Sequence, residues 1–129
     1  MTRREYRVES QAEPISHFTH AVRAGDLLFV SGIVAVDTEG RLVGGDDVVA
    51  QARQVFDNMG AVLAAAGCAF ADVVKVTVYL TDIDDRPRIN PVRQEVFGEA
   101  RPASTLVEVP RLAVEGAKVE VECVALVPS

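Results

Sequence analysis

The stretch RPASTLVEVPRLAVEGAKVEVECVALV, residues 101–127, decides the fold predicted for this chain. It contains two segments in which apolar and polar residues alternate, residues 104–109 and 117–127, joined by a loop. Alternation with a period of two among β-branched residues is typical of β-strands. The second segment becomes apolar on both faces, at Val124 and Leu126, so its acidic residues lie on a strand that ends buried. Carboxylates placed in this way are paired, hydrogen-bonded or functional.

Length and composition favour a single domain over residues 1–129. The hydrophobic fraction of 49% and the charged fraction of 25% are typical of soluble globular proteins, and no apolar run reaches membrane-spanning length. A net charge of -6 with 5% aromatic residues disfavours a nucleic-acid surface. The two cysteines, Cys68 and Cys123, form neither a metal motif nor a disulfide framework. We therefore expect reduced thiols in a cytoplasmic protein.

Residues 46–66 show the clearest helical periodicity. Their apolar residues recur at i, i+3, i+4 and i+7, which predicts an amphipathic helix. Asp46 or Asp47 can cap its first turn, and Gly67 stands where a left-handed residue commonly follows a helix. The apolar positions are Val48, Val49, Ala52, Val55, Phe56, Met59, Val62, Leu63 and Ala66.

Residues 82–100 predict a second helix. Pro87 fits its first turn, whereas Pro91 cannot donate a hydrogen bond to residue 87. The helix therefore either kinks at Pro91 or begins there, with Asn90 as its cap. The acidic cluster at residues 82–85 is expected to be a solvated helix start. The apolar stripe consists of Ile89, Val92, Val96 and Phe97.

Four more strands are predicted by alternating or apolar runs at residues 3–8, 19–23, 27–36 and 72–81. The order β-β-β-α-β-α-β-β describes an α+β domain with one six-stranded sheet, and two helices can cover one face of such a sheet. The run at residues 27–36 and the end of the C-terminal strand are apolar on both faces. The uncovered face would then expose a large apolar patch, so we expect a homo-oligomer unless a strand is wrongly assigned.

Several stretches together carry a family resemblance: AVRAGDLLFVSG at residues 21–32, QARQVFDNMGAVLAAAG at residues 51–67, DVVKVTVYLTD at residues 72–82, Asn90, and the C-terminal PASTLVEVPRL and VEVECVAL. On these residues the chain resembles the Rid family of reactive-intermediate deaminases (RidA/YjgF-like proteins) from about residue 15 to residue 127. The resemblance implies a chorismate-mutase-like α+β subunit with a mixed sheet, and a homotrimer with clefts between neighbouring subunits. It also implies hydrolysis of short-lived enamines and imines to 2-oxo acids and ammonia, with no cofactor and no metal.

Some positions match the family pattern and others depart from it. Ser104 stands where family deaminases usually carry the arginine that binds the substrate carboxylate. Serine cannot make the bidentate charge-assisted contact of an arginine, so we expect a substrate other than simple 2-aminoacrylate. Phe18 replaces a family tyrosine, and Arg93 occupies a helix position that is often tyrosine. Glu120 matches the acidic residue that the family places near the hydrolytic water.

Glu120 is the catalytic candidate, because hydrolysis of an iminium needs a base that activates water. The alternative is a structural role in a salt bridge with Lys75 or Lys118. Ser31 and Gly32 interrupt an apolar strand, and a glycine there permits close approach of a ligand or of another chain. The alternative at this pair is a β-bulge.

The remaining candidates also have two interpretations each. Asn90 either binds substrate or only caps a helix, and Arg93 is either an anion-binding group or a solvated charge. His17 lies beside a predicted cleft residue and suits proton transfer, but a polar loop residue is the simpler interpretation. The full set of predicted substrate-binding residues is His17, Phe18, Ser31, Gly32, Asn90, Arg93, Ser104, Thr105 and Leu106.

Three functions compete at this point. The first is an enamine or imine deaminase that acts on a small molecule. The second is a binding or chaperone-like trimer that has kept the cleft and lost the chemistry. The third, an RNA-cleaving translation inhibitor, is disfavoured by the acidic charge balance. We expect no nucleic-acid partner and no membrane partner.

Overall fold

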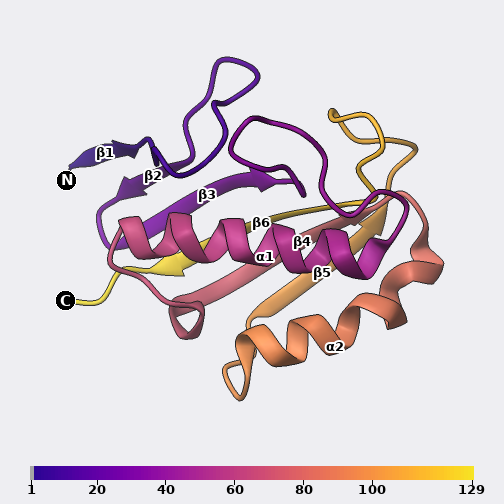
Figure 1. Cartoon of the computed structure of the whole chain (residues 1–129). Helices are drawn as coiled ribbons and strands as arrows, with labels where there is room; N and C mark the ends of the chain where they lie inside the picture. Colours follow the sequence, from indigo (N-terminus) through magenta and orange to yellow (C-terminus); the bar gives the residue numbers. More distant parts are fainter. Residues whose placement is uncertain (1) are drawn as a thin grey trace.

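The alternating C-terminal stretch forms the last two strands of a six-stranded mixed sheet with the order β1-β2-β3-β6-β4-β5 (Figure 1). The computed structural model describes residues 2–129. Neighbouring strands are antiparallel except β4 and β5, which are parallel and are joined through α2. This confirms the predicted element order. The strands are β1 (Arg3–Tyr6), β2 (Ala21–Ala24), β3 (Leu27–Ile33), β4 (Val73–Leu80), β5 (Ala103–Glu108) and β6 (Val119–Leu126); the helices are α1 (Val48–Ala65) and α2 (Arg86–Phe97).

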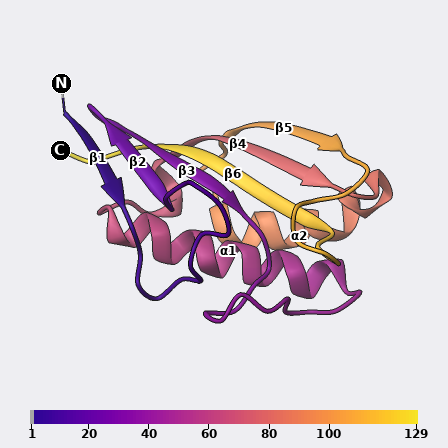
Figure 2. The ribbon, with the colours of Figure 1, turned by 90° about the horizontal axis from the view of Figure 1, so that it is seen from above.

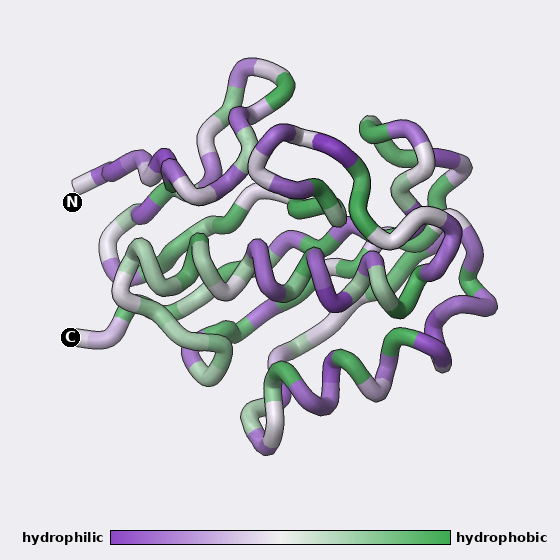
Figure 3. The backbone as a smooth tube through the Cα atoms, viewed as in Figure 1, coloured by the Kyte–Doolittle hydropathy of each residue, from purple (hydrophilic) through white to green (hydrophobic). Residues whose placement is uncertain are grey.

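Both helices lie on one side of the sheet, as Figure 2 shows. Strand β6 runs through the middle of the sheet, and its alternation places Val119, Val121, Cys123 and Ala125 in the core beneath the helices. In Figure 3 the central strands are mostly hydrophobic, whereas the edge strand β1 is hydrophilic. The core therefore sits between one sheet face and the two helices, as the pattern of the sequence predicts.

Helix α1 begins and ends where the sequence indicates. The Asp47 carboxylate accepts hydrogen bonds from the backbone N–H groups of Val49 at 3.0 Å and Ala50 at 3.3 Å, so Asp47 is the N-cap. Gly67 follows the helix with a φ of 77°, a left-handed conformation that glycine adopts at little cost. No helix within residues 2–129 is long and apolar enough to cross a bilayer.

Helix α2 begins at Arg86, with Pro87 in its first turn as predicted. Pro91 lies inside the helix, so the alternative in which the helix begins at Pro91 with Asn90 as its cap is wrong. Ile89, which precedes Pro91, is buried against the core, and this packing keeps the first turn helical despite the missing hydrogen bond. The acidic cluster forms a 3₁₀ turn before the helix, and it is not wholly solvated, because Asp85 is buried.

Strand β3 ends at Ile33, three residues short of the predicted end at Val36. Its register with β6 shifts between Val30 and Ile33, which is a β-bulge at Ser31 and Gly32. Beyond the bulge, the Asn58 side chain on α1 donates to the carbonyls of residues 34 and 36 at 3.3 and 2.9 Å. The last part of the predicted strand is therefore held by a helix side chain instead of the sheet.

The helix-free face of the sheet is partly apolar. Side chains on four strands of this sheet are exposed by 39% to 50% in the single chain. The strand pairing places Leu27 and Phe29 of β3 opposite the end of β6. The helices lie on the other side of the sheet. The uncovered apolar face predicted from the sequence is thus present. Its large members are Leu27, Phe29, Val74, Val107 and Leu126.

Candidate functional site

The bulge in β3 makes room for the Glu120 carboxylate. Glu120 lies on β6, and a Cβ atom added at Gly32 would overlap its carboxylate oxygen and stand 2.9 Å from its Cδ. Any side chain at position 32 would therefore push Glu120 aside. The β-bulge interpretation is confirmed, whereas the close approach of a ligand or of another chain stays a prediction. In this chain the space beside the glycine is taken by a carboxylate of the neighbouring strand.

Glu120 is partly buried, and its surroundings disfavour the charged form. Burial raises the pKa of its carboxyl group, and the nearby negative charge of Glu122 raises it further. No salt bridge within residues 2–129 includes Glu120. The alternative in which Glu120 forms a salt bridge with Lys75 or Lys118 is therefore wrong within the described residues.

The register of β4 and β6 keeps Lys75 away from Glu120. Lys75 pairs with Val124, and Glu120 pairs with Tyr79, so the two charges are four residues apart along β4. That separation is about 13 Å, beyond the reach of an ion pair. The Lys75 ammonium instead donates to the hydroxyl of Thr105 on the adjacent strand at 2.6 Å.

A cavity of about 410 Å³ opens beside Glu120. The candidates Phe18, Ser31, Gly32 and Glu120 all line it, together with residues of the loop between β1 and β2. The wall is largely apolar, and the polar residues Gln11, Glu13, Ser16 and Asn58 also line it. A base with a raised pKa at the edge of an apolar cavity can take a proton from a bound water.

Ser31 has a structural role in this cavity. Its hydroxyl donates to the carbonyl of Thr19 at 2.6 Å, and its backbone N–H donates to the carbonyl of His20 at 3.0 Å. These two bonds attach the bulge of β3 to the segment that precedes β2. The geometry of the glycine beside Ser31 is thereby fixed from the side of the loop.

A second cluster brings Arg93 and Ser104 together. The Arg93 guanidinium donates to the Ser104 hydroxyl at 2.8 Å, which links α2 to β5 on the helix-covered face. Burial lowers the pKa of Arg93, and none of the salt bridges among the described residues includes this side chain. Arg93 is therefore a partly buried cation without a carboxylate partner among the described residues, and its anion-binding role stays a prediction.

The other predicted binding residues are spread around this second cluster or lie apart. Thr105 faces the opposite side of β5, where it binds Lys75, and Leu106 packs against the core. Asn90 is exposed on α2, one turn before Arg93. His17 is exposed on the loop before β2 and does not line the cavity.

The two clusters do not meet within one chain. Glu120 lies between the buried Val119 and Val121, so its side chain belongs to the helix-free face, whereas Ser104 belongs to the helix-covered face. Strands β6 and β5 are separated by β4, a distance of about 10 Å between backbones. A small substrate cannot contact both clusters of a single chain.

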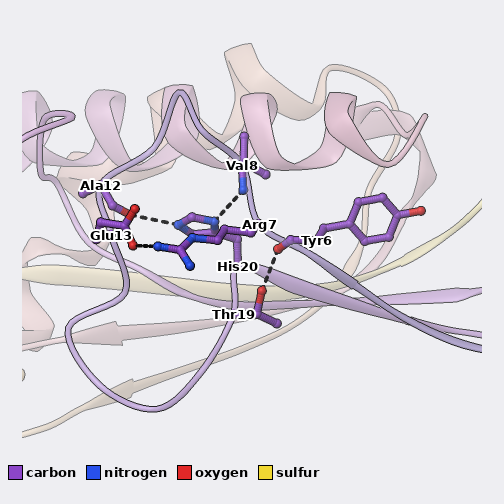
Figure 4. A network of polar contacts seen from close by, with 7 residues as sticks. All are labelled: Tyr6, Arg7, Val8, Ala12, Glu13, Thr19 and His20. Atoms are coloured by element: carbon purple, nitrogen blue, oxygen red, sulfur yellow. Dashed lines mark hydrogen bonds and ion pairs between the residues drawn. The ribbon is translucent and has the colours of Figure 1, made fainter.

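Two residues of the site were not found from the sequence. The Tyr79 hydroxyl donates to Glu122 at 2.6 Å, and this hydrogen bond raises the pKa of Tyr79. His20 lines the cavity, and both nitrogens of its ring are hydrogen-bonded within the loop (Figure 4). The alternation of residues 72–81 places Tyr79 on the same face as the acidic residues of β6, but no sequence pattern reveals the partners of His20.

Comparisons with known proteins give a consistent result. The family model described as endoribonuclease L-PSP matches residues 8–127. A RutC family protein of Pyrococcus horikoshii is 42% identical over 91% of this chain and 92% of the relative. The human 2-iminobutanoate/2-iminopropanoate deaminase is 37% identical over 87% of this chain and 81% of the relative. The crystal structure of a protein of unknown function of the conserved Rid family from Yersinia pestis has 30% identity and a TM-score of 0.92, covering 98% of this chain and all of that chain.

Proposed function

Because the chain belongs to the YjgF/Rid family, we propose that it is a hydrolytic deaminase of reactive enamines and imines. The products are ammonia and a 2-oxo acid or a related carbonyl compound. The observation that carries the proposal is the Glu120 carboxylate, which has a raised pKa, has no salt bridge among the described residues and borders an apolar cavity. Relatives from human and goat bear the name 2-iminobutanoate/2-iminopropanoate deaminase, which supports the reaction class.

The proposed reaction uses Glu120 as a general base. Protonation of the enamine carbon by solvent first gives the iminium ion. Water then attacks the iminium carbon while Glu120 takes a proton from the water, which gives a neutral tetrahedral amino alcohol. The proton on Glu120 passes to the nitrogen and regenerates the carboxylate. The carbon–nitrogen bond then breaks, ammonia leaves, and the hydroxyl group returns a proton to solvent as the carbonyl forms, so no cofactor is needed.

The Arg93–Ser104 cluster is suited to bind a carboxylate on the substrate. The guanidinium is partly buried and keeps donors free after its bond to the serine hydroxyl. Charge-assisted hydrogen bonds to a carboxylate are stronger than neutral ones. Since this guanidinium reaches Ser104 from α2, its position differs from that of an arginine on β5 itself. The substrate is therefore proposed to be an acid other than simple 2-aminoacrylate.

The complete site is proposed to form between neighbouring subunits of a homotrimer. Within one chain, Glu120 and the Arg93–Ser104 cluster lie on opposite faces of the sheet, so contact with one substrate requires a second copy. The exposed apolar side chains of the helix-free face supply a surface for that copy. A cytoplasmic location belongs to the same proposal, because Cys68 and Cys123 are free thiols.

RNA cleavage, the activity named in the description of the family model, is not proposed for this chain. RNA binding draws most of its affinity from basic groups that neutralise phosphates. This chain carries a net charge of -6, with 19 acidic and 13 basic residues. Ribonuclease activity that survives Glu120→Gln would contradict the exclusion of RNA cleavage.

Ammonia release from freshly generated imines tests the proposal. The substrates would be 2-iminobutanoate, 2-iminopropanoate and a panel of bulkier enamines, each compared with spontaneous hydrolysis without protein. We expect catalysis on at least one bulkier acid and weaker catalysis on the smallest imine. Rates equal to the spontaneous rate across the panel would favour the non-catalytic binding trimer.

A further inference from the structure

The loop between β1 and β2 forms one wall of the cavity beside Glu120. It contributes Gln11, Ala12, Glu13, Pro14 and several residues up to His20 to the cavity lining. The loop contains no helix or strand, so its position depends on side-chain and turn hydrogen bonds. The question is which of these bonds holds the wall in place.

The imidazole of His20 spans the loop from the inside, as Figure 4 shows. The backbone N–H of Val8 donates to Nδ1 at 2.8 Å, and Nε2 lies 2.9 Å from the carbonyl oxygen of Ala12. An N–H donor can bond only to an unprotonated Nδ1, so the ring proton must lie on Nε2, where it is donated to Ala12. One tautomer thus satisfies both contacts, and both nitrogens are engaged within the loop.

The backbone of His20 connects this wall to the Glu120 side of the cavity. Its carbonyl accepts from the N–H of Ser31, which adjoins the glycine that faces the Glu120 carboxylate. The neighbouring Thr19 hydroxyl donates to the carbonyl of Tyr6 at 2.8 Å, so the end of the loop is tied to β1 as well. A displacement of the ring would therefore move the wall relative to the bulge.

The side-chain ion pair across the loop is weak by comparison. Arg7 and Glu13 form an ion pair, and their side chains are 66% and 74% exposed. Exposed ion pairs contribute little, because water screens them and two long side chains must be ordered. The partly buried imidazole contacts are less accessible to competing water.

We propose that His20 is a positioning residue: its neutral imidazole, with the proton on Nε2, holds the wall at residues 11–18 against the bulge that accommodates Glu120. It does so without contacting the reacting atoms, since neither nitrogen is left for a substrate. This role concerns the shape of the cavity and does not depend on the proposed deaminase activity.

Two substitutions separate the two bonds of the ring. His20→Asn keeps an acceptor near the position of Nδ1, and His20→Gln keeps a donor near the position of Nε2. His20→Ala removes both. Ser10→Ala is the matched control, because Ser10 is an exposed residue of the same loop and its side chain does not line the cavity.

The test combines ring-nitrogen NMR of the wild type with amide hydrogen exchange of all variants. We expect the Nε2–H tautomer at neutral pH. We also expect at least ten-fold faster exchange at Val8 in His20→Ala and His20→Gln, near-normal exchange in His20→Asn and Ser10→Ala, and unchanged exchange in β6. An Nδ1–H tautomer, or an unchanged Val8 exchange rate in His20→Ala, would overturn the proposal.

If the chain is a deaminase, KM in His20→Ala should rise more than kcat falls, and His20→Asn should recover most of the loss. If neither His20→Asn nor His20→Gln recovers the activity, and kcat and kcat/KM fall equally, the ring has a chemical role instead of a positioning role. If the wild type proves inactive, the proposed function fails, whereas the tautomer and exchange results still decide the role of His20.

Discussion

At the scale of single residues, the site depends on a glycine and two carboxylates. Gly32 leaves room for Glu120, and Glu122 adds to the effect of burial on the Glu120 pKa. Each relation predicts a measurable coupling between neighbours, because a change in one residue alters the energy of the other.

Gly32→Ala should destabilise the fold and displace the Glu120 carboxylate. The added methyl group meets the far end of a flexible side chain, so the chain should still fold. In the background of Glu120→Ala the clash disappears and the cost of the alanine should shrink. Denaturant unfolding of the four proteins should give a coupling free energy of about 0.5–3 kcal/mol. Additive effects would mean that the glycine is needed for a different reason.

Glu122→Gln should move the acid limb of the pH–activity profile to lower pH. The active form of Glu120 is the carboxylate, so activity is lost as pH falls through its pKa, which lies above the usual value for glutamate of about 4.3. Removal of the Glu122 charge lowers the pKa of Glu120 and keeps the base ionised to lower pH. Glu99→Gln, the same charge change at an exposed site, is the control. An acid limb that shifts equally in both variants would point to net charge instead of this pair.

The raised pKa of Glu120 also predicts a dependence of stability on pH. A carboxyl group whose folded-state pKa is raised contributes stability below its unfolded-state pKa and loses it as pH rises through the folded-state pKa. At pH 7 the ionised group is therefore a cost, and Glu120→Gln should be more stable than the wild type by ~1 kcal/mol or less. The difference should shrink as pH falls toward the unfolded-state pKa of about 4.3 and vanish at about pH 3, where both states bind the proton. Lower stability of the variant at pH 7 would contradict this.

At the scale of elements, the contact between α2 and β5 delivers a guanidinium to Ser104. Arg93→Ala should raise KM for an anionic substrate by ~10-fold or more and lower kcat less, because a charge-assisted bond to the bound anion is lost. Arg86→Ala, an exposed arginine on the same helix, should leave KM unchanged. Equal KM values in the two variants would remove Arg93 from the anion site.

The sequence predicts the elements whose packing and local pattern agree. The bounds of α1 follow from its periodicity and its Asp47 cap, and the face alternation of β6 follows from period two. The continuation of α2 through Pro91 could not be predicted, because the burial of Ile89 outweighs the local effect of this proline. The early end of β3 depends on a hydrogen-bonding side chain from α1, which no local pattern contains.

The candidate site was predictable only in part for the same reason. Gly32 can be singled out because it interrupts an apolar strand, and Glu120 because it matches the acidic residue of the Rid family on a strand that ends buried. The Arg93–Ser104 contact depends on how α2 crosses β5, and the partners of His20 are backbone groups that any residue could supply. Tertiary geometry, and not residue type, decides these contacts.

At the scale of the whole molecule, the apolar helix-free face predicts an oligomer, and the resemblance to the Rid family implies that this oligomer is a homotrimer. Light scattering should give three times the chain mass of 13.8 kDa. Phe29→Asp places a charge on this face and should shift the mass toward one chain. Ile83→Asp, at a similarly exposed apolar residue on the turn before α2, should not. A wild-type monomer at micromolar concentration would defeat the interface and the site proposed to form there.

The central claim is that Glu120 activates water for imine hydrolysis. The most direct measurement is kcat/KM for ammonia release, relative to spontaneous hydrolysis, in the wild type and in Glu120→Gln on the best imine of the panel. The substitution keeps size and shape but removes basicity, so the rate should fall by ~10²–10⁴-fold while circular dichroism and molecular mass stay unchanged. Equal rates in the two proteins, with the fold intact, would contradict the account.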